Sequence, residues 1–141
     1  MELRLTDTPL LKERALAIRR ALLCPGTTRA PEQEQDALDG EAVQLLAEED
    51  GKPLGCGRYV VLPDGWAKGS RIAVLPDGRG MGVGRAIVEE LMRRAKAQGC
   101  PGFCLHARRT ALGFYQRLGF RETGETFLED GIPHIRVERR L

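Results

Sequence analysis

The stretch from Arg71 to Ala97, RIAVLPDGRGMGVGRAIVEELMRRAKA, constrains the fold most, because an apolar strand runs into a glycine-rich turn and then into a helix. Gly78, Gly80, Gly82 and Gly84 permit backbone conformations that other residues avoid, and they leave no Cβ beside the main chain. They stand where a helix begins and its first amide groups lack partners. Those amides and the helix dipole favour a phosphate, so the stretch predicts an anion-binding site.

The helix after the turn should be amphipathic, because its apolar residues recur at spacings of three and four. They are Val83, Ile87, Val88, Leu91, Met92 and Ala95. On the charged face, Glu89 with Arg93 and Glu90 with Arg94 are four residues apart in the favourable order, so we expect two ion pairs. Gly99 should end the helix.

Two well-known phosphate-binding motifs do not fit the turn. A dinucleotide fingerprint requires G-x-G-x-x-G, and counting from Gly80 and Gly82 places Arg85 where the third glycine should stand. A P-loop requires Gly-Lys-Ser/Thr after the glycines, which this sequence lacks. From the turn alone, a simple glycine turn that lets a strand pack closely on a helix stays open as an alternative.

The pattern that does fit is Arg79-x-x-Gly82-x-Gly84, preceded by Val74-x-Pro76. It resembles the Q/R-x-x-G-x-G/A acyl-CoA signature of the GCN5-related N-acetyltransferases, the GNAT superfamily. In that family the loop amides bind the pyrophosphate of CoA.

A second motif, Ala111-x-x-Phe114-Tyr115-x-x-x-Gly119-Phe120, resembles the A-x-x-F-Y-x-x-x-G-F signature of the same family. Two motifs in the family's order are far more specific than either alone.

Periodicity and turn signals predict the order β-α-β-β-β-α-β-α-β-β in one domain over residues 1–141. We expect strands at 2–6, 42–48, 53–62, 66–75, 102–106, 120–128 and 133–140, and helices at 8–23, 83–97 and 110–118. Asp50-Gly51 and Asp130-Gly131 are hairpin signals. The apolar face of the first helix should comprise Leu10, Leu11, Ala15, Ile18 and Leu22. Residues 24–40 should form a surface loop with a short helical turn.

This succession agrees with the resemblance, which implies an α/β (α+β mixed sheet) GNAT-like fold. Its central, mostly antiparallel sheet is flanked by helices, and the strands before and after the long helix splay apart to admit the cofactor. His106-Ala107, residues 124–137 (GETFLEDGIPHIRV) and the early loop resemble the bacterial ElaA/YjcF-like branch. One departure is Gly26-Thr27, where that branch often has a Glu-Gln pair.

The resemblance implies an N-acetyltransferase that transfers acetyl from acetyl-CoA to a primary amine by direct attack in a ternary complex. The residues that it assigns to acyl-CoA binding are Ile72, Ala73, Val74, Arg79, Gly80, Met81, Gly82, Val83, Gly84, Arg85, Ala111, Phe114 and Tyr115. A catalytically weak acyl-CoA-binding or regulatory module on the same fold is the alternative.

Tyr115 is the expected general acid, because a phenol can protonate the departing thiolate when the two are hydrogen-bonded. The amine must also lose a proton. The expected base is His134 or Glu34, with Asp36 and His106 as further candidates.

Composition excludes several other functions. A formal charge of +2, with arginine pairs that lack interleaved aromatics, gives no reason to expect a nucleic-acid partner. No apolar run is long enough to cross a membrane and the N-terminus does not resemble a signal peptide, so we expect a cytoplasmic protein. The four cysteines have no C-x-x-C spacing and only two histidines accompany them, which predicts reduced buried thiols and no metal site. A homodimer, common in the family, stays open.

Overall fold

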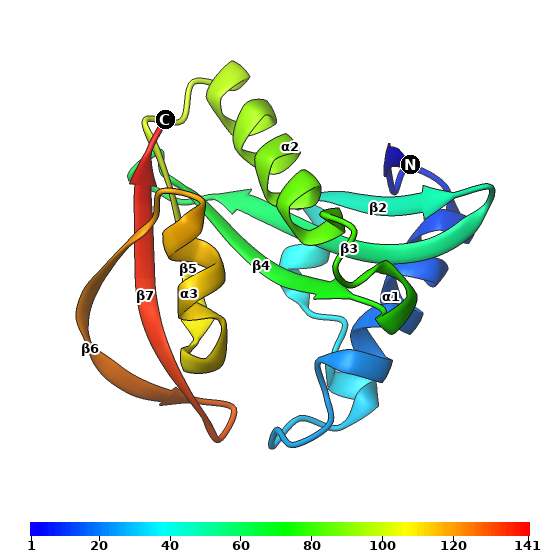
Figure 1. Cartoon of the computed structure of the whole chain (residues 1–141), viewed down its shortest axis with the longest axis horizontal. Helices are drawn as coiled ribbons and strands as arrows, with labels where there is room; N and C mark the ends of the chain where they lie inside the picture. Colours follow the sequence, from blue (N-terminus) through cyan, green and yellow to red (C-terminus); the bar gives the residue numbers. More distant parts are fainter.

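A computed structural model describes residues 1–141, which form one seven-stranded sheet with helices on both faces (Figure 1). The strands are β1 (Glu2–Leu5), β2 (Val43–Glu49), β3 (Lys52–Val61), β4 (Ala67–Val74), β5 (Gly102–Arg108), β6 (Arg121–Glu129) and β7 (Ile132–Arg140). The helices are α1 (Pro9–Leu22), α2 (Val83–Ala97) and α3 (Leu112–Arg117). Short 3₁₀ turns lie at Pro31–Gln33, Ala37–Gly40, Pro76–Gly78 and Arg109–Ala111.

The strands follow one another in the sheet as β1-β2-β3-β4-β5-β7-β6. All neighbours are antiparallel except β4 and β5, which α2 connects as a parallel pair. The element order and the mixed, mostly antiparallel sheet confirm the fold class expected from the sequence, and the element bounds lie within two residues of the expected ones.

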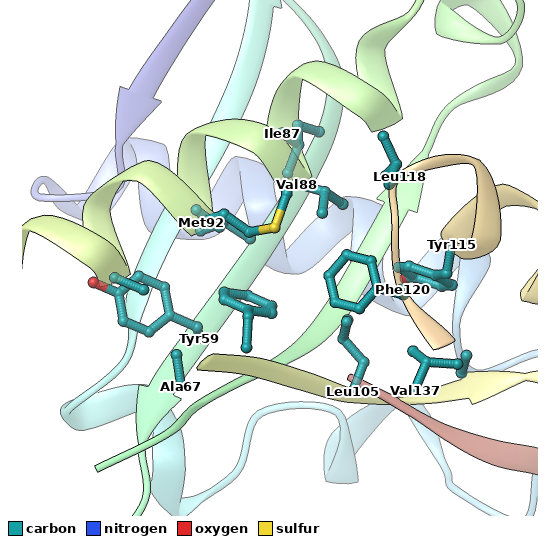
Figure 2. Close-up of a cluster of buried hydrophobic side chains, with 14 of the residues drawn as sticks. Tyr59, Ala67, Ile87, Val88, Met92, Leu105, Tyr115, Leu118, Phe120 and Val137 are labelled. Atoms are coloured by element: carbon teal, nitrogen blue, oxygen red, sulfur yellow. The ribbon is translucent and has the colours of Figure 1, made fainter. Parts of the chain in front are cut away.

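The long helix α2 packs its predicted apolar stripe into the larger core, because all six residues of that stripe are buried. Figure 2 shows three of them, Ile87, Val88 and Met92, in one cluster with Tyr115 and Phe120 of the C-terminal half. One expected ion pair on the exposed face is wrong. Glu89 pairs with Arg85, at 2.7 Å, instead of Arg93, which pairs with Glu90. The other expected pair is confirmed, since Arg94 lies 3.9 Å from Glu90.

The first helix, α1, covers the opposite face of the sheet and begins at Thr8, whose hydroxyl accepts a hydrogen bond from the Leu11 amide. Its apolar face differs from the expected one at Leu10, which is 60% exposed. Arg19 is buried on that face instead and is only 2% exposed. Arg19 is buried there because it pairs with the carboxylates of Glu34 and Asp39 beneath α1.

The parallel strands β4 and β5 separate along their length. Only Ala67–Gly69 pair with Phe103–Leu105, although β4 continues to Val74 and β5 to Arg108. A register shift between β3 and β4 accompanies Arg71, a non-glycine residue with φ of 54°. Backbone groups of the unpaired part of β4 therefore face the gap between the strands, where the family resemblance implied a slot.

The segment after α1, residues 23–30, closes the open end of this gap. The Thr28 amide donates to the Asp130 carbonyl at 3.0 Å, and Arg29 Nε lies 3.0 Å from an Asp130 carboxylate oxygen. Figure 1 shows the segment after α1 beside the turn between β6 and β7. The gap is thus bounded at its base by paired strands and at its end by two turns.

No helix of the chain is both long enough and apolar enough to span a bilayer. The four cysteines are buried and unpaired, as the sequence predicted.

Candidate functional site

A cavity of about 490 Å³ occupies the space between the separated strands. Its walls come from β3, β4, β5, α3, the segment after α1, and the hairpin formed by β6 and β7. Six of the residues expected to bind acyl-CoA line it, namely Ile72, Ala73, Val74, Arg79, Ala111 and Tyr115. Two histidines that the sequence suggested as bases, His106 and His134, line the same cavity.

The remaining expected acyl-CoA residues lie in and around the glycine turn. Gly80 and Gly82 adopt φ values of 77° and 75°, which L side chains rarely adopt. Gly82 caps α2 without any side-chain hydrogen bond, in contrast to Thr8 at the start of α1. The first amides of α2 therefore keep free N–H groups, and a Cβ added at Gly80 or Gly82 would meet no atom within 4 Å. This open, uncapped helix end suits a phosphate.

Side chains around the turn have different roles. Val83 is 1% exposed and packs in the core, so it can offer a ligand only its backbone. Met81 is 58% exposed, and Arg85 makes a surface ion pair with Glu89. Beneath the turn, the Phe114 ring lies 3.4 Å from the position of a Cβ on Gly84, which leaves little space for any larger residue there.

The Tyr115 ring packs edge-on against Phe114 and Phe120, with centroid distances of 5.0 and 5.7 Å. Burial raises the pKa of Tyr115, so the phenol keeps its proton across the neutral range. Tyr115 is 7% exposed and lines the cavity, and its hydroxyl makes no hydrogen bond to a protein group.

Glu129 brings the two histidines together on the other wall of the cavity. His106 Nδ1 donates to Glu129 Oε1 at 2.8 Å, and His134 Nε2 lies 3.6 Å from Glu129 Oε2. His134 Nδ1 lies 2.7 Å from the Ile132 carbonyl oxygen, which can only accept, so this nitrogen carries the hydrogen. The lone pair of neutral His134 is therefore on Nε2, the nitrogen that faces Glu129.

Sequence reasoning did not single out Glu129, although the hairpin signal at Asp130-Gly131 contained the necessary information. A turn centred there pairs Phe127 with His134 across β6 and β7. Alternation then puts Glu129 on the face that carries Phe127 and His134. The Phe127 ring stacks on His134, with their planes 25° apart, and meets His106 edge-on.

Glu34 lies elsewhere. It is fully buried beneath α1 and is not among the residues that line the cavity. Its carboxylate is ion-paired with Arg29, with Arg19 at 3.3 Å and with Arg71 at 2.8 Å. The Cys24 thiol donates to the same carboxylate. This placement gives no support to Glu34 as the base. Three guanidiniums surround its two carboxylate oxygens, and Glu34 does not line the cavity in which a substrate amine would bind.

Two further carboxylates complete this internal cluster, and one of them, Asp36, reaches the cavity wall. Arg58, only 1% exposed, donates to both Asp36 and Asp39 at 2.8 Å. The hydrogen bond from Arg58 lowers the pKa of Asp36. Burial by itself would raise the pKa of Asp39, but hydrogen bonds from Arg19 and from the Asp36 amide bring it far below its usual range.

These lowered pKa values predict a loss of stability in acid. Unfolding raises the pKa of both aspartates to ordinary values near 3.9, so their contribution is complete above about pH 5 and declines as pH falls below it. We expect the urea midpoint to be constant from pH 7 to pH 5 and to fall between pH 4 and pH 2.

An Asp39→Asn variant should have a lower urea midpoint at pH 6 than the unaltered protein. Because Asn cannot ionise, the urea midpoint of this variant should also fall less steeply as the pH is lowered. An equally steep decline in this variant would show that the acid sensitivity arises in other carboxylates.

No group of three or more His, Cys, Asp or Glu side chains is arranged to hold a metal ion. Burial raises the pKa of all four thiols, which disfavours the reactive thiolate form.

Comparison with known proteins agrees with this geometry. Residues 41–122 match the model of the acetyltransferase (GNAT) domain. The chain is 38% identical over 107 residues to the uncharacterised N-acetyltransferase YjcF of Bacillus subtilis, covering 75% of this chain and 76% of YjcF.

Two solved structures superpose on nearly the whole chain. An acyl-CoA N-acyltransferase from Pseudomonas aeruginosa shares 28% identity with a TM-score of 0.83, and the match covers 98% of both chains. Escherichia coli ElaA, at 22% identity and the same coverage, has a TM-score of 0.84 and shares the fold. The family model matches more than half of the chain, and YjcF is a relative of high similarity. The chain therefore belongs to the GNAT family of acetyltransferases.

Proposed function

We propose that this protein transfers the acetyl group of acetyl-CoA to a primary amine by direct attack in a ternary complex. The observation that carries the proposal is the cavity between the separated strands β4 and β5. The open glycine turn before α2 lies close by, and the cavity walls carry both the Tyr115 side chain and the histidine cluster. The GNAT family uses acyl-CoA, and the chain's family membership supports that donor.

The donor would be held mainly by backbone. Free amides at the start of α2 and the nearby Arg79 side chain suit the pyrophosphate. The unpaired part of β4, which includes Ile72–Val74 on the cavity wall, offers fixed amide dipoles to the thioester oxygen, where negative charge develops during attack. Fixed dipoles are effective there because they need not reorient as the charge forms.

Proton movements are assigned to side chains on the two walls. A primary amine with a pKa near 10.4 is mostly protonated at neutral pH and must lose a proton before attack. We assign its removal to His134 Nε2, directly or through water, with Glu129 stabilising the imidazolium that forms. Attack forms the C–N bond, and collapse of the tetrahedral intermediate breaks the C–S bond. Tyr115 protonates the departing thiolate, and the second proton that the nitrogen releases restores the phenol. No covalent enzyme intermediate is required.

The test is thiol release from acetyl-CoA across a panel of amines, combined with histidine variants. We expect the His134→Gln variant to lose at least about tenfold in kcat/KM and to lose the acidic limb of its pH profile. His106→Gln should retain that limb, because His106 already donates its Nδ1 hydrogen to Glu129. If His134→Gln retains the limb and His106→Gln loses it, the base is His106.

Binding of acetyl-CoA without thiol release for any amine would instead favour a non-catalytic acyl-CoA-binding module. The presence of Tyr115 on the cavity wall, with a hydroxyl that no protein group engages, argues against that alternative, because binding alone does not require a proton donor there.

A further inference from the structure

Basic side chains outnumber acidic ones on the cavity wall. The basic ones are Arg29, Arg58, Lys68, Arg71, Arg79 and Arg108, and the acidic ones are Asp36, Glu129 and Asp130. Three of the arginines, Arg29, Arg58 and Arg71, are neutralised by carboxylates of the internal cluster or by Asp130.

Three cations on the wall have no carboxylate within 4 Å, namely Lys68, Arg79 and Arg108. Arg79 follows β4 at the glycine turn and donates a hydrogen bond to the Val74 carbonyl. It therefore lies at the end of the cavity proposed to bind acetyl-CoA. Lys68 and Arg108 lie on the sheet strands beside the histidine cluster. They have no assigned role in binding acetyl-CoA. Their positive charges are therefore available to bind the amine substrate that accepts the acetyl group.

Arg108 is held next to the proposed base. It ends β5 and pairs directly with His134 on β7, so the two side chains leave the same face of the sheet about 5 Å apart at Cβ. Its Nη2 donates to the Leu23 carbonyl at 3.1 Å, which fixes the guanidinium against the end of α1. That bond uses one of five N–H donors, and the others make no hydrogen bond to the protein.

The same carbonyl also accepts from Arg29, so two guanidiniums meet at this point. Arg29 is compensated by Glu34 and Asp130, whereas Arg108 is not. An anion at Arg108 would therefore relieve repulsion between like charges as well as gain charge-assisted hydrogen bonds.

Lys68 lies at the closed end of the gap, where β4 and β5 are still paired. Its backbone partner is Cys104, two residues before His106 on β5. The uncompensated cations thus flank the histidine cluster on both sides, Lys68 towards the paired strands and Arg108 towards the turns. Two such charges disfavour an acceptor that carries several ammonium groups.

We propose that the amine acceptor also carries an anionic oxygen group, a carboxylate or a phosphate, which Arg108 binds while the amine lies at His134. Lys68 adds attraction from the opposite side of the cluster. This inference rests on the proposed function and specifies its substrate class, because it favours amino acids and phosphorylated amines over polyamines. A planar guanidinium suits both anions, since each can accept two parallel hydrogen bonds.

The experiment uses acceptor pairs that differ mainly in the anion. β-Alanine is compared with β-alaninamide for the carboxylate, O-phosphoethanolamine with ethanolamine for the phosphate, and spermidine serves as the polycationic acceptor. In the unaltered protein we expect kcat/KM to favour the anionic member of at least one pair by about 10-fold or more. The pair with the larger ratio identifies which anion is preferred.

Arg108→Gln should bring that ratio close to one, mainly through a higher KM for the anionic acceptor. The matched control is Arg109→Gln, which removes the same charge from the next residue. Arg109 does not line the cavity, and it pairs with Glu122 on the surface. This control should leave the ratio unchanged.

A readout that does not depend on turnover separates this inference from the proposed function. The Nε–Hε NMR signal of Arg108, assigned by its loss in Arg108→Gln, should shift on titration with β-alanine or O-phosphoethanolamine and not with ethanolamine. A shift without thiol release would contradict the acetyl-transfer proposal and leave the anion site standing.

Three results would overturn the anion site. They are equal kcat/KM values within both acceptor pairs, a preference for spermidine, and no shift of the Arg108 signal with either anion. An Arg109→Gln variant that loses the ratio as fully as Arg108→Gln would overturn it too, because the effect would then come from overall charge.

Discussion

Replacing Tyr115 with phenylalanine should lower kcat at least about 100-fold, the scale typical of a general acid, while the affinity for acetyl-CoA stays within about threefold. The ring and its packing against Phe114 and Phe120 are retained in this variant, and only the hydroxyl is lost. Because no protein group is bonded to that hydroxyl, its removal should leave the fold intact. The expected loss is therefore in the chemical step alone.

Burial raises the pKa of Tyr115, and this has two consequences for the mechanism. The phenol stays protonated at every working pH, so activity should not decline in base through its ionisation. It is also a weaker acid than an exposed phenol. To act as the proposed acid, it requires a leaving thiolate that is desolvated in the same cavity and is therefore more basic than a thiol in water, whose pKa is near 8.5.

The chain offers a matched control in its other tyrosine. The Tyr59 hydroxyl donates to Gln98 at 2.6 Å at the C-terminal end of α2, and Tyr59 does not line the cavity. Tyr59→Phe should retain full turnover and lose about 1 kcal/mol of stability, the typical net value of a hydrogen bond.

Stopped-flow thiol detection should be used for both variants, so that chemistry is measured directly instead of product release. Full turnover in Tyr115→Phe, with chemistry limiting, would remove Tyr115 from the acid role.

The sequence predicted those features that short-range patterns encode. The stripe of α2 and the hairpin turns at Asp50-Gly51 and Asp130-Gly131 follow from local spacing, whereas the separation of the strands around the long helix follows from the family resemblance. The stripe and the two turns each depend on residues within one element or one turn, where periodicity and turn chemistry are reliable guides.

Long-range charge pairing was not predictable in this way. Arg19 occupies the buried face of α1 because carboxylates 15 and 20 residues further along the chain fold beneath it. Glu34 was interpreted as a candidate base because an acidic loop near an amine site is chemically reasonable. Only the three-dimensional arrangement shows that arginines from α1, the following loop and β4 surround it.

That arrangement makes Glu34→Gln the variant with the largest expected effect on stability, a loss of about 3 to 5 kcal/mol in the free energy of unfolding. The carboxylate is the common partner of Arg19, Arg29 and Arg71. Without its charge, desolvated guanidiniums would face each other with too little compensation. Burial already lowers the pKa of Arg71 in spite of the opposing effect of Glu34, which indicates that the guanidinium depends on this carboxylate for its charged form.

Urea unfolding at pH 7 measures this loss, and Glu125→Gln is the matched control. Glu125 lies on the exposed edge strand β6 and makes no ion pair, so its neutralisation should change the free energy of unfolding by less than about 0.5 kcal/mol. A loss of 3 to 5 kcal/mol is a large share of the roughly 5 to 15 kcal/mol typical of a domain. The Glu34→Gln variant should therefore be assayed at low temperature, where it remains folded.

Turnover of the folded variant then decides between the two roles of Glu34. If the carboxylate only holds the arginines that shape the cavity, Glu34→Gln should keep the acidic limb of its pH profile and change KM for the acceptor more than kcat. A stable variant that has lost that limb would restore Glu34 as the base. The internal cluster would then have to open during the reaction, since the carboxylate is fully buried and lies away from the cavity wall.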